Sequence, residues 1–349
     1  MSERLLLSSP SESKSIVPST IRIENLLQNY EASPPKIYES RILPIRDLPE
    51  GFTVYNPAEG SSMLLGRVEH KDDENSQVWA FHNDGDGWKP NGLRIPNAQD
   101  PHLKTVMIDG KPFYLFDGVR VGKHPKYESL GNVYYTAYWC VKNIEDIPTT
   151  EPFAYTPPFY KDTPVVQYEE DAWGVFPRPQ GEKGGRGVVC YKEFKRLDEL
   201  STAIEEAVRI RDLQHLFDKE TVWGGFKDAF PLRKEGLVGL GGHVSYYTDE
   251  SGNIVRQGSL RVYNVASAVY NRLTGRIEEM WIELTTEDLP DCESKILPNF
   301  HPDNLRRVAF GTVWDRLGNG RERILGGLRD RHVFEVVKED RFERWERAA

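Results

Sequence analysis

Two carboxylates frame a short hairpin in the first third of the sequence. Asp100 is followed by a proline and an apolar run, the chain turns at Asp109-Gly110, and an aromatic run leads back to Asp117. Asp-Gly between two apolar runs is a strong signal for a two-residue hairpin turn. The pattern therefore places one acid at the entrance of the hairpin and the other at its exit. Such a pair suits a polar site at the mouth of a β-fold, and glycoside chemistry runs on carboxylates of this kind.

The segments around this hairpin also look like short strands. From about residue 52 onward, turn signals rich in Gly, Asp and Asn recur between short apolar runs. Repeated hairpins of this kind are typical of a sandwich, a barrel or a propeller, and no clear sequence repeat chooses among these three. One segment differs, because its apolar residues recur at helical spacing between charged residues. It predicts an amphipathic helix at about 196–217, which could cover a sheet or mediate a homo-oligomer contact.

The composition is that of an ordinary globular protein. The chain has 349 residues and a net charge of −9, which argues against general nucleic-acid binding because that depends on Lys and Arg neutralising phosphates. A local basic pocket for one phosphate remains compatible with this charge. Residues 1–20 are rich in Ser, Pro and charge and are predicted to be a flexible segment. Residues 21–349 are predicted to form a single domain.

Three cysteines, Cys140, Cys190 and Cys292, form neither a CxxC pair nor a dense framework. Their odd number fits a reducing compartment. The leucine run that starts at Leu5 is too short for a signal peptide, and no run has the length of a membrane span. We therefore expect a cytoplasmic protein that acts on small molecules, with no membrane or nucleic-acid partner. The sequence predicts no metal site and no cofactor.

Five segments share both their residue types and their order with a known enzyme family. They are Tyr55-Asn56-Pro57 with Leu64-Leu65-Gly66-Arg67, Asp100-Pro101 with its hairpin, Val175-Phe176-Pro177-Arg178, Lys234-Glu235-Gly236-Leu237 through His243, and Gly326-Gly327-Leu328-Arg329-Asp330. In this order they resemble the mannosyltransferase/phosphorylases related to the mannoside phosphorylases of glycoside hydrolase family 130. The resemblance implies an all-β fold, a five-bladed β-propeller, with the amphipathic helix inserted between its third and fourth blades.

The same resemblance implies an inverting mannosyltransferase/phosphorylase that builds or phosphorolyses manno-oligosaccharides, with mannose 1-phosphate or GDP-mannose as donor. Asp100 matches the general acid of the family. The positions implied for substrate binding are Asn56, Arg67, His102, Asp117 and Asp330. Those implied for phosphate binding are Arg178 and His243, with Arg120 and Arg329 as further candidates.

Some features of the sequence favour other interpretations. Asp100 could cap the turn before Pro101, and a histidine such as His243 in an apolar run is usually a core residue. Residues 170–173 stand where phosphorolytic members carry a basic or amide pair, which favours a nucleotide-sugar donor. Two alternatives therefore stay open. One is an inverting glycoside hydrolase on the same fold, and the other is a non-catalytic carbohydrate-binding propeller.

Overall fold

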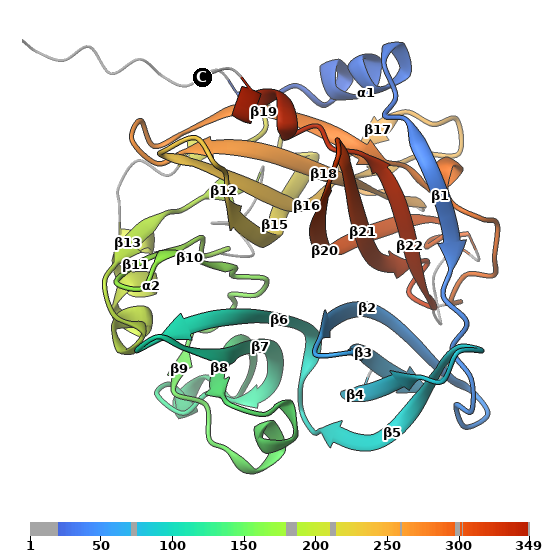
Figure 1. The fold of residues 1–349 in the computed structure, drawn as a ribbon. Helices are drawn as coiled ribbons and strands as arrows, with labels where there is room; N and C mark the ends of the chain where they lie inside the picture. The colour runs from blue at the N-terminus through green and yellow to red at the C-terminus, as the bar shows by residue number, and fades with distance from the viewer. Residues whose placement is uncertain are drawn as a thin grey trace, which may run out of the picture.

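The structure, a computed structural model, describes residues 20–70, 75–178, 187–209, 214–258, 260–296, 301 and 303–347. The predicted flexible segment therefore lies outside the described residues, except for Thr20. Strands dominate the described chain and form several sheets grouped around a common centre (Figure 1). Among the described residues, no helix is long and apolar enough to cross a membrane.

The first three sheets follow one another along the chain and are built from neighbouring antiparallel strands. The first contains β2 (Phe52–Gly60), β3 (Met63–His70), β4 (Ser76–Asn83) and β5 (Trp88–Ile95). The second contains β6 (Gln99–Ile108), β7 (Lys111–Lys123), β8 (Asn132–Val141) and β9 (Ala154–Tyr155). The third contains β10 (Val165–Glu169), β11 (Ala172–Val175) and β13 (Lys192–Phe194), and a separate pair joins β12 (Val188–Val189) to β14 (Gln214–His215).

The last sheet has nine strands and consists of two antiparallel groups. The first group is β15 (Val222–Pro231), β16 (Leu237–Thr248), β17 (Ile254–Val255), β18 (Leu260–Asn271) and β19 (Arg276–Leu284). The second is β20 (Arg307–Gly318), β21 (Arg321–Leu328), β22 (His332–Glu339) and β1 (Ile37–Ile42). A short parallel pairing of β18 with β20 joins the groups. Because β1 pairs with β22, the second group combines an early segment of the chain with a late one (Figure 1).

Three helices accompany the sheets, and the predicted amphipathic helix is among them. They are α1 (Ile23–Ala32), α2 (Leu200–Arg209) and α3 (Glu343–Arg347). Leu200 and Ile204 of α2 pack with Trp173 and Phe194 of the third sheet, so this helix covers a sheet face. It is shorter than the predicted range of 196–217. Its last predicted residues belong elsewhere because β14 pairs with β12 instead of continuing the helix.

The hairpin predicted around Asp109-Gly110 is confirmed. Strands β6 and β7 are joined by these two residues, and Ile108 pairs with Lys111. Asp109 and Gly110 both have positive φ, 50° and 68°, which is the conformation of a type I′ turn. That turn matches the natural twist of the two strands. It therefore fixes the register that pairs His102 with Asp117 across the hairpin.

The first strands of successive sheets lie next to one another near the centre and carry β-bulges. Strand β2 contacts β6 and β20, and β15 contacts β10 and β20. The register shifts in β2, β6, β15 and β20 fall at the bulge residues, which are Asn56-Pro57, Asp100-Pro101, Lys227 and Thr312. A bulge releases a residue from the alternation of the strand and re-aims its side chain. The bulge residues therefore project toward the neighbouring sheets.

Hydrogen bonds join these bulge residues across sheet boundaries. Thr312 on β20 donates through Oγ1 to the carbonyl oxygen of Pro57 on β2, at 2.5 Å. Asn56 on β2 donates through Nδ2 to Asp100 Oδ1 on β6, at 2.8 Å. Lys227 on β15 donates through Nζ to the main-chain carbonyl of Asp100, at 2.7 Å. The contacts between sheets at the centre are therefore polar and specific.

A separate charged group lies inside the nine-stranded sheet. Glu283 on β19, Glu322 on β21 and Lys338 on β22 are each 0% exposed. Lys338 Nζ lies 2.7 Å from Glu283 Oε2 and also donates to Glu322 Oε1. We call these three residues the interior triad. They line none of the cavities described below.

Candidate active site

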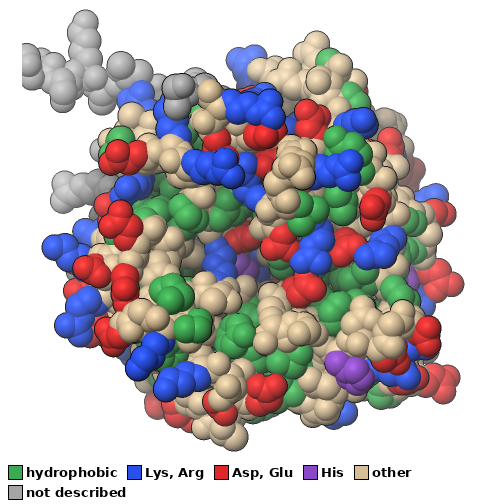
Figure 2. Space-filling model, viewed as in Figure 1, with side chains coloured by type: hydrophobic (Ala, Val, Ile, Leu, Met, Phe, Trp, Pro, Cys, Tyr) green, Lys and Arg blue, Asp and Glu red, His purple; other side chains and the backbone are tan. Residues whose placement is uncertain are grey.

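A cavity of about 270 Å³ opens where the sheets meet and has an unusually charged lining. Its acidic side chains are Glu69, Asp100, Asp162 and Asp330, and its basic side chains are Arg67, Lys161, Arg178, Arg261 and Lys295. His243 and the aromatic residues Tyr55, Trp223, Tyr263 and Phe310 complete much of the wall. The face seen in Figure 1 is hollowed near its middle, where charged and histidine side chains gather (Figure 2). A concave site that mixes apolar surface with convergent polar groups is typical of ligand binding.

Most of the residues predicted from the sequence come together at this cavity. Asn56, Arg67, Asp100, Arg178, His243 and Asp330 line it. They come from β2, β3, β6, the segment after β11, β16 and the turn after β21. His102 and Asp117 are buried on the β6–β7 hairpin and do not line it. Arg120 and Arg329 do not line it either.

Asp100 is held from several sides. Its backbone has a φ of 47°, which is uncommon for a residue other than glycine, and its side chain is buried. Asn56 donates to Oδ1, and Arg67 Nη1 lies 3.2 Å from Oδ1 and 3.4 Å from Oδ2. Together with the bond from Lys227 to the carbonyl of Asp100, these contacts fix both the backbone and the carboxylate of this residue.

The electrostatic surroundings of Asp100 favour its ionised form. Burial raises the pKa of this carboxyl, but the charges of Arg67, Lys161 and Lys227 and the hydrogen bond from Asn56 outweigh burial. They hold the pKa well below its ordinary value. A general acid needs a raised pKa, so these surroundings by themselves do not favour the acid form of Asp100. Asp100 is a carboxylate here and can accept a proton.

A chain of alternating charges continues from Asp100 along one wall. Arg67 Nη2 donates to Glu69 Oε2 at 2.9 Å, and Lys295 donates to Glu69 Oε1. The guanidinium of Arg67 also lies over the ring of Tyr55, 5.1 Å from its centroid. Such packing removes most of the freedom of the arginine side chain, so its planar fork is pre-oriented for hydroxyl or carboxylate groups.

Asp330 adds a carboxylate that the other described residues leave unpaired. Its backbone and that of Arg329 both have positive φ, 51° and 57°, in the turn between β21 and β22. Burial raises the pKa of Asp330, with Arg67 opposing this effect and Glu69 adding to it. The carboxylate makes no hydrogen bond or ion pair with another described residue. A ligand hydroxyl is the kind of donor that would satisfy it.

Another part of the lining suits an anion. Arg178 donates through Nη1 to Asp162 Oδ2 at 2.7 Å. This bond uses one N–H donor of the guanidinium, so other donors of the same group can bind a ligand. Burial lowers the pKa of His243 well below its ordinary value, and the charges of Arg178 and Lys161 lower it further. His243 Nδ1 lies 2.5 Å from Ser245 Oγ, and its ring stacks on Tyr263. Neutral His243 could therefore donate through Nε2 if Ser245 donates to Nδ1.

Lys161 lies between the two parts of the site. Its charge acts on the pKa values of both Asp100 and His243, which requires it to be near each. Within the described chain its ammonium makes neither a hydrogen bond nor an ion pair. The cavity therefore contains a cation without a structural partner, next to the carboxylate that can accept a proton.

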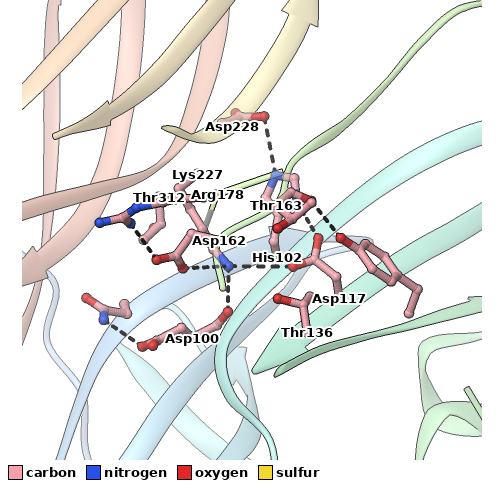
Figure 3. Close-up of polar contacts among 12 residues, drawn as sticks. Asp100, His102, Asp117, Thr136, Asp162, Thr163, Arg178, Lys227, Asp228 and Thr312 are labelled. Carbon is pink, nitrogen blue, oxygen red and sulfur yellow. Dashed lines mark hydrogen bonds and ion pairs between the residues drawn. The ribbon is translucent and has the colours of Figure 1, made fainter. Parts of the chain in front are cut away.

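A buried network of charges lies beside the cavity, and we call it the axial network (Figure 3). Its members are His102, Asp117, Asp162, Arg178, Lys227 and Asp228. His102 lies between two carboxylates, with Nδ1 2.9 Å from Asp117 Oδ2 and Nε2 3.3 Å from Asp228 Oδ1. Burial lowers the pKa of His102, but these two carboxylates outweigh burial and raise it.

The axial network reaches a second cavity as well. This cavity of about 370 Å³ is lined by His102, Lys104 and Asp228, among others. Lys104 Nζ lies 2.7 Å from Asp228 Oδ1, so Asp228 is shared between a lysine and His102. His102 thus links Asp117 and Asp228, which lie on different strands, and it does not line the first cavity. Its predicted contact with substrate would have to be indirect in this structure.

Arg120 and Arg329 have partners away from the first cavity. The guanidinium of Arg120 lies over Trp139, 5.0 Å from the ring centroid. Arg329 donates through Nη1 to Asp291 at 2.8 Å and through Nε to the carbonyl of Arg306 at 3.0 Å. Arg329 lines a separate surface cavity that also contains Arg307. Neither residue reaches the anion-binding part of the first cavity.

Several residues that complete the site were not predicted from the sequence. They are Glu69, Lys161, Asp162, Lys227 and Lys295. A sequence signal was available only for the neighbourhood of Asp162. Asn56-Pro57, Asp100-Pro101 and Thr163-Pro164 each place a polar residue before a proline at or near a first strand. Proline inside a strand indicates a bulge or an edge, so this recurrence marks the polar residues around the centre.

The described residues contain no group of three or more His, Cys, Asp or Glu side chains arranged to hold a metal ion. Cys140, Cys190 and Cys292 are all free thiols. The ionisable side chains that line the first cavity include carboxylates, cations and a histidine.

Solved structures with the same fold include enzymes that act on mannose. A mannose phosphorylase from Leishmania mexicana, solved in complex with a phosphate ion, is 26% identical, with a TM-score of 0.73 over 92% of this chain and 94% of that chain. A GDP-Man-dependent mannosyltransferase from the same organism is 24% identical, with a TM-score of 0.71 over 92% and 95%. A β-1,2-mannobiose phosphorylase from Listeria innocua is 14% identical, with a TM-score of 0.54 over 91% and 100%.

The similarity to the mannose phosphorylase confirms the relation to the mannosyltransferase/phosphorylases that the order of the motifs indicated, and the mannobiose phosphorylase shares the fold. These similarities also support a mostly β, propeller-like architecture and a carbohydrate-active enzyme. No curated protein matches the chain. The chain belongs to the family described as "Protein of unknown function (DUF1861)", which matches residues 30–344.

Proposed function

We propose that this member of the DUF1861 family is an inverting mannosyltransferase/phosphorylase that builds or phosphorolyses manno-oligosaccharides. One observation carries the proposal. A carboxylate held in its ionised form, Asp100, lies in the same cavity as Lys161, Arg178 and His243, which together suit an anion. The mannose phosphorylase and the mannosyltransferase that share this fold add weight to mannose as the transferred sugar.

The proposal includes a single domain with five blades. The grouping of strands supports it, because there are five antiparallel groups among the described residues, namely β2–β5, β6–β9, β10 with β11 and β13, β15–β19, and β20–β22 with β1. On this view the bulge residues are corresponding positions of different blades. The composition of the chain is our reason for placing the enzyme in the cytoplasm.

The ionised state of Asp100 supports the synthetic direction. In that direction the acceptor hydroxyl loses its proton to Asp100 as its oxygen forms a bond to the anomeric carbon of the donor. The bond from that carbon to the phosphate oxygen breaks, and its electron pair leaves with the phosphate. Lys161 and Arg178 would stabilise the leaving anion, and His243 would donate a hydrogen bond to it. One displacement inverts the anomeric carbon without a covalent enzyme intermediate.

Phosphorolysis is the reverse of this step and needs Asp100 to be protonated. A phosphate dianion beside Lys161 would offset one of the positive charges that lower the pKa of Asp100. Binding of phosphate would thereby favour the acid form that protonates the departing sugar oxygen. Phosphate and proton are thus coupled through Lys161, and no second carboxylate is required.

The size of the cavity and Lys161 favour mannose 1-phosphate over GDP-mannose as donor. The cavity volume of about 270 Å³ is small beside the 300 to about 1,000 Å³ typical of sites for drug-sized ligands. It suits one hexose and a phosphate better than a nucleotide sugar. The sequence favoured a nucleotide donor because basic residues were missing at 170–173, and Lys161 supplies such a charge from a different segment.

Asp330 is the observation that keeps an inverting hydrolase as a second candidate. Hydrolysis needs a second carboxylate that activates water, some distance from the acid. Asp330 lines the same cavity and has no ion-pair partner among the described residues. Activity on mannosides that is independent of phosphate and is lost in Asp330→Asn would favour the hydrolase.

To test the proposal, purified protein is incubated with mannose as acceptor and either mannose 1-phosphate or GDP-mannose as donor. The products are then resolved by chromatography. We expect oligomannosides and released phosphate from mannose 1-phosphate, and no product from Asp100→Asn. Phosphorolysis of the products on addition of phosphate would establish reversibility. An inactive wild type with both donors, under conditions where it is folded, would contradict the proposed function.

A further inference from the structure

We infer that Lys227 is a positioning residue that links Asp100 to the anion-binding side chains, an inference that rests on the proposed function. Lys227 occupies the bulge of β15, where Phe226 pairs with Gly242 and Asp228 pairs with Gly241. The bulge turns Lys227 out of the regular alternation of the strand. Its side chain is 1% exposed, and Figure 3 places it among Asp100, Asp117 and Asp162.

The first link holds the backbone of Asp100. Lys227 Nζ donates to the main-chain carbonyl of Asp100 at 2.7 Å, across the boundary between two sheets. Asp100 has a φ of 47°, a conformation that persists only where the surroundings hold it. Lys227 therefore stabilises the backbone conformation that directs the carboxylate toward Asn56 and Arg67.

The second link holds the anion side. Lys227 Nζ lies 3.5 Å from Asp162 Oδ1, while Asp162 Oδ2 accepts the hydrogen bond from Arg178. Asp162 thus has one oxygen toward Lys227 and the other toward Arg178. A shift of Lys227 would move the carboxylate that orients the arginine. Asp100 and Arg178 are therefore positioned by the same ammonium.

The third link is electrostatic. Lys227 also lies 3.6 Å from Asp117 Oδ1, and its own charge is retained because three carboxylates face it. The charged groups that face Asp100 are Arg67, Lys161, Lys227, Asp330 and Glu69. Of the three cations in that set, Lys227 is the one without access to the cavity. A ligand in the cavity cannot contact Lys227 directly, so Lys227 adds to the lowering of the Asp100 pKa, beside the larger effects of Arg67 and Lys161, whether or not the site is occupied.

Lys227→Met is the direct test, with Lys338→Met as the matched control. Both lysines are buried, and each contacts two carboxylates, but Lys338 belongs to the interior triad. We measure kcat, KM for mannose 1-phosphate and the pH dependence of kcat. In Lys227→Met we expect kcat to fall by about 10²-fold, because small misplacements of a reacting group cost that much. The limb of the pH profile that reports Asp100 should move to higher pH.

Lys338→Met should lower the melting temperature without moving that limb. If Lys227→Met also lowers only the melting temperature and leaves kcat and the limb unchanged, the positioning role is wrong. If Lys227→Met is too unstable to purify, the double variant Lys227→Met with Asp117→Asn takes its place. The second change neutralises Asp117, one of the carboxylates that lose the lysine as their partner. The inference predicts that this pair of changes restores folding and leaves kcat low. Recovery of kcat together with stability would overturn it.

A readout without catalysis separates failure of this inference from failure of the proposed function. Carbon-13 NMR of labelled aspartates, with the Asp100 signal assigned from Asp100→Asn, follows the titration of that carboxyl. The titration should move to higher pH in Lys227→Met and stay in place in Lys338→Met. This result would support the positioning role even if the wild type transferred no mannose. An unmoved titration in Lys227→Met would overturn it even if the enzyme were active.

Discussion

The axial network and the interior triad both bury charge, but the axial network borders the two cavities of the site region, and the triad lines neither of them. In the axial network, cations and carboxylates alternate, so Asp117, Asp162 and Asp228 each lie beside a lysine or an arginine, and His102 lies between two of these carboxylates. In the triad, two glutamates share one lysine. Burial raises the pKa of Glu322 to about 8, against the pull of Lys338 and with the addition of Glu283. The raised pKa thus favours a proton on Glu322, which reduces the negative charge that Lys338 has to balance.

This difference shows what buried charge can and cannot indicate. Desolvation of charged groups is costly in both places and is offset by pairing in both. A perturbed pKa alone would select the triad as readily as the active site. The axial network differs because its members end at a cavity that contains unpaired groups, Lys161 and Asp330. Unpaired groups at a cavity, more than buried charge, indicate function here.

The largest expected effect that separates the two regions is on catalysis. Asp100→Asn should lower mannosyl transfer by about 10²- to 10⁴-fold, because it removes the group that accepts the acceptor proton. The fold should persist, since Asn retains the size of the side chain. Initial rates with mannose 1-phosphate and a far-UV circular dichroism spectrum check both expectations. A matched change in the triad, Glu283→Gln, should leave the rate per folded molecule unchanged.

The next effect is on stability and belongs to the triad. Lys338→Met leaves two buried glutamates without a cation, and breaking a buried pair in this way costs about 3–5 kcal/mol. Urea denaturation at pH 7 should show this loss in the free energy of unfolding. The loss should shrink at pH 5, where both glutamates can be protonated. A loss of the same size at both pH values would contradict this account.

A smaller effect should appear at the anion-binding part of the cavity. Lys161→Met should raise KM for mannose 1-phosphate by about 10- to 100-fold, since a hydrogen bond to a charged group contributes about 1.5–3 kcal/mol. The free energy of unfolding should change little, because Lys161 has no ion pair among the described residues. Steady-state kinetics and urea denaturation of the same sample measure both. A large loss of stability would show that Lys161 has a structural role.

The smallest expected effect concerns Glu322 and the free energy of unfolding. It is measured as the change of that free energy with pH. The pKa of Glu322 is raised from 4.5 to about 8, so the folded protein keeps a proton that the unfolded chain releases between these values. The contribution of Glu322 to stability therefore falls as pH rises from 4.5 to 8 and levels off above 8. Glu322→Gln should flatten this slope in denaturation curves measured from pH 5 to 9. An unchanged slope in Glu322→Gln would mean that a different group keeps the proton in the folded protein.

The sequence predicted the elements whose signals are local. The hairpin at Asp109-Gly110 follows from two residues that accept positive φ. The motif order placed Asn56, Arg67, Asp100, Arg178, His243 and Asp330 in the site, and the cavity brings these six together. The helix was placed in the correct region, but its end was set too late because the pairing of β14 with β12 depends on residues far apart in sequence.

The residues that could not be predicted act across sheets. Lys227 contacts Asp100 only because bulges in β15 and β6 turn both toward the centre, and no local pattern encodes that meeting. Arg120 and Arg329 had suitable chemistry but found partners in Trp139 and Asp291. Their sequence neighbours gave no sign of this. A search for polar residues before prolines would have pointed to the segment around Asp162, next to Thr163-Pro164, but the partners of each lysine required the fold.

The pairing of β1 with β22 has a consequence for the order of events during synthesis. The ribosome makes residues 37–42 long before their partner strand, at 332–339. Asp330 belongs to the turn that leads into that late strand. Contacts of such wide sequence separation form slowly. A nascent chain therefore cannot assemble this cavity from its first three sheets alone, and must wait for the strands that flank Asp330.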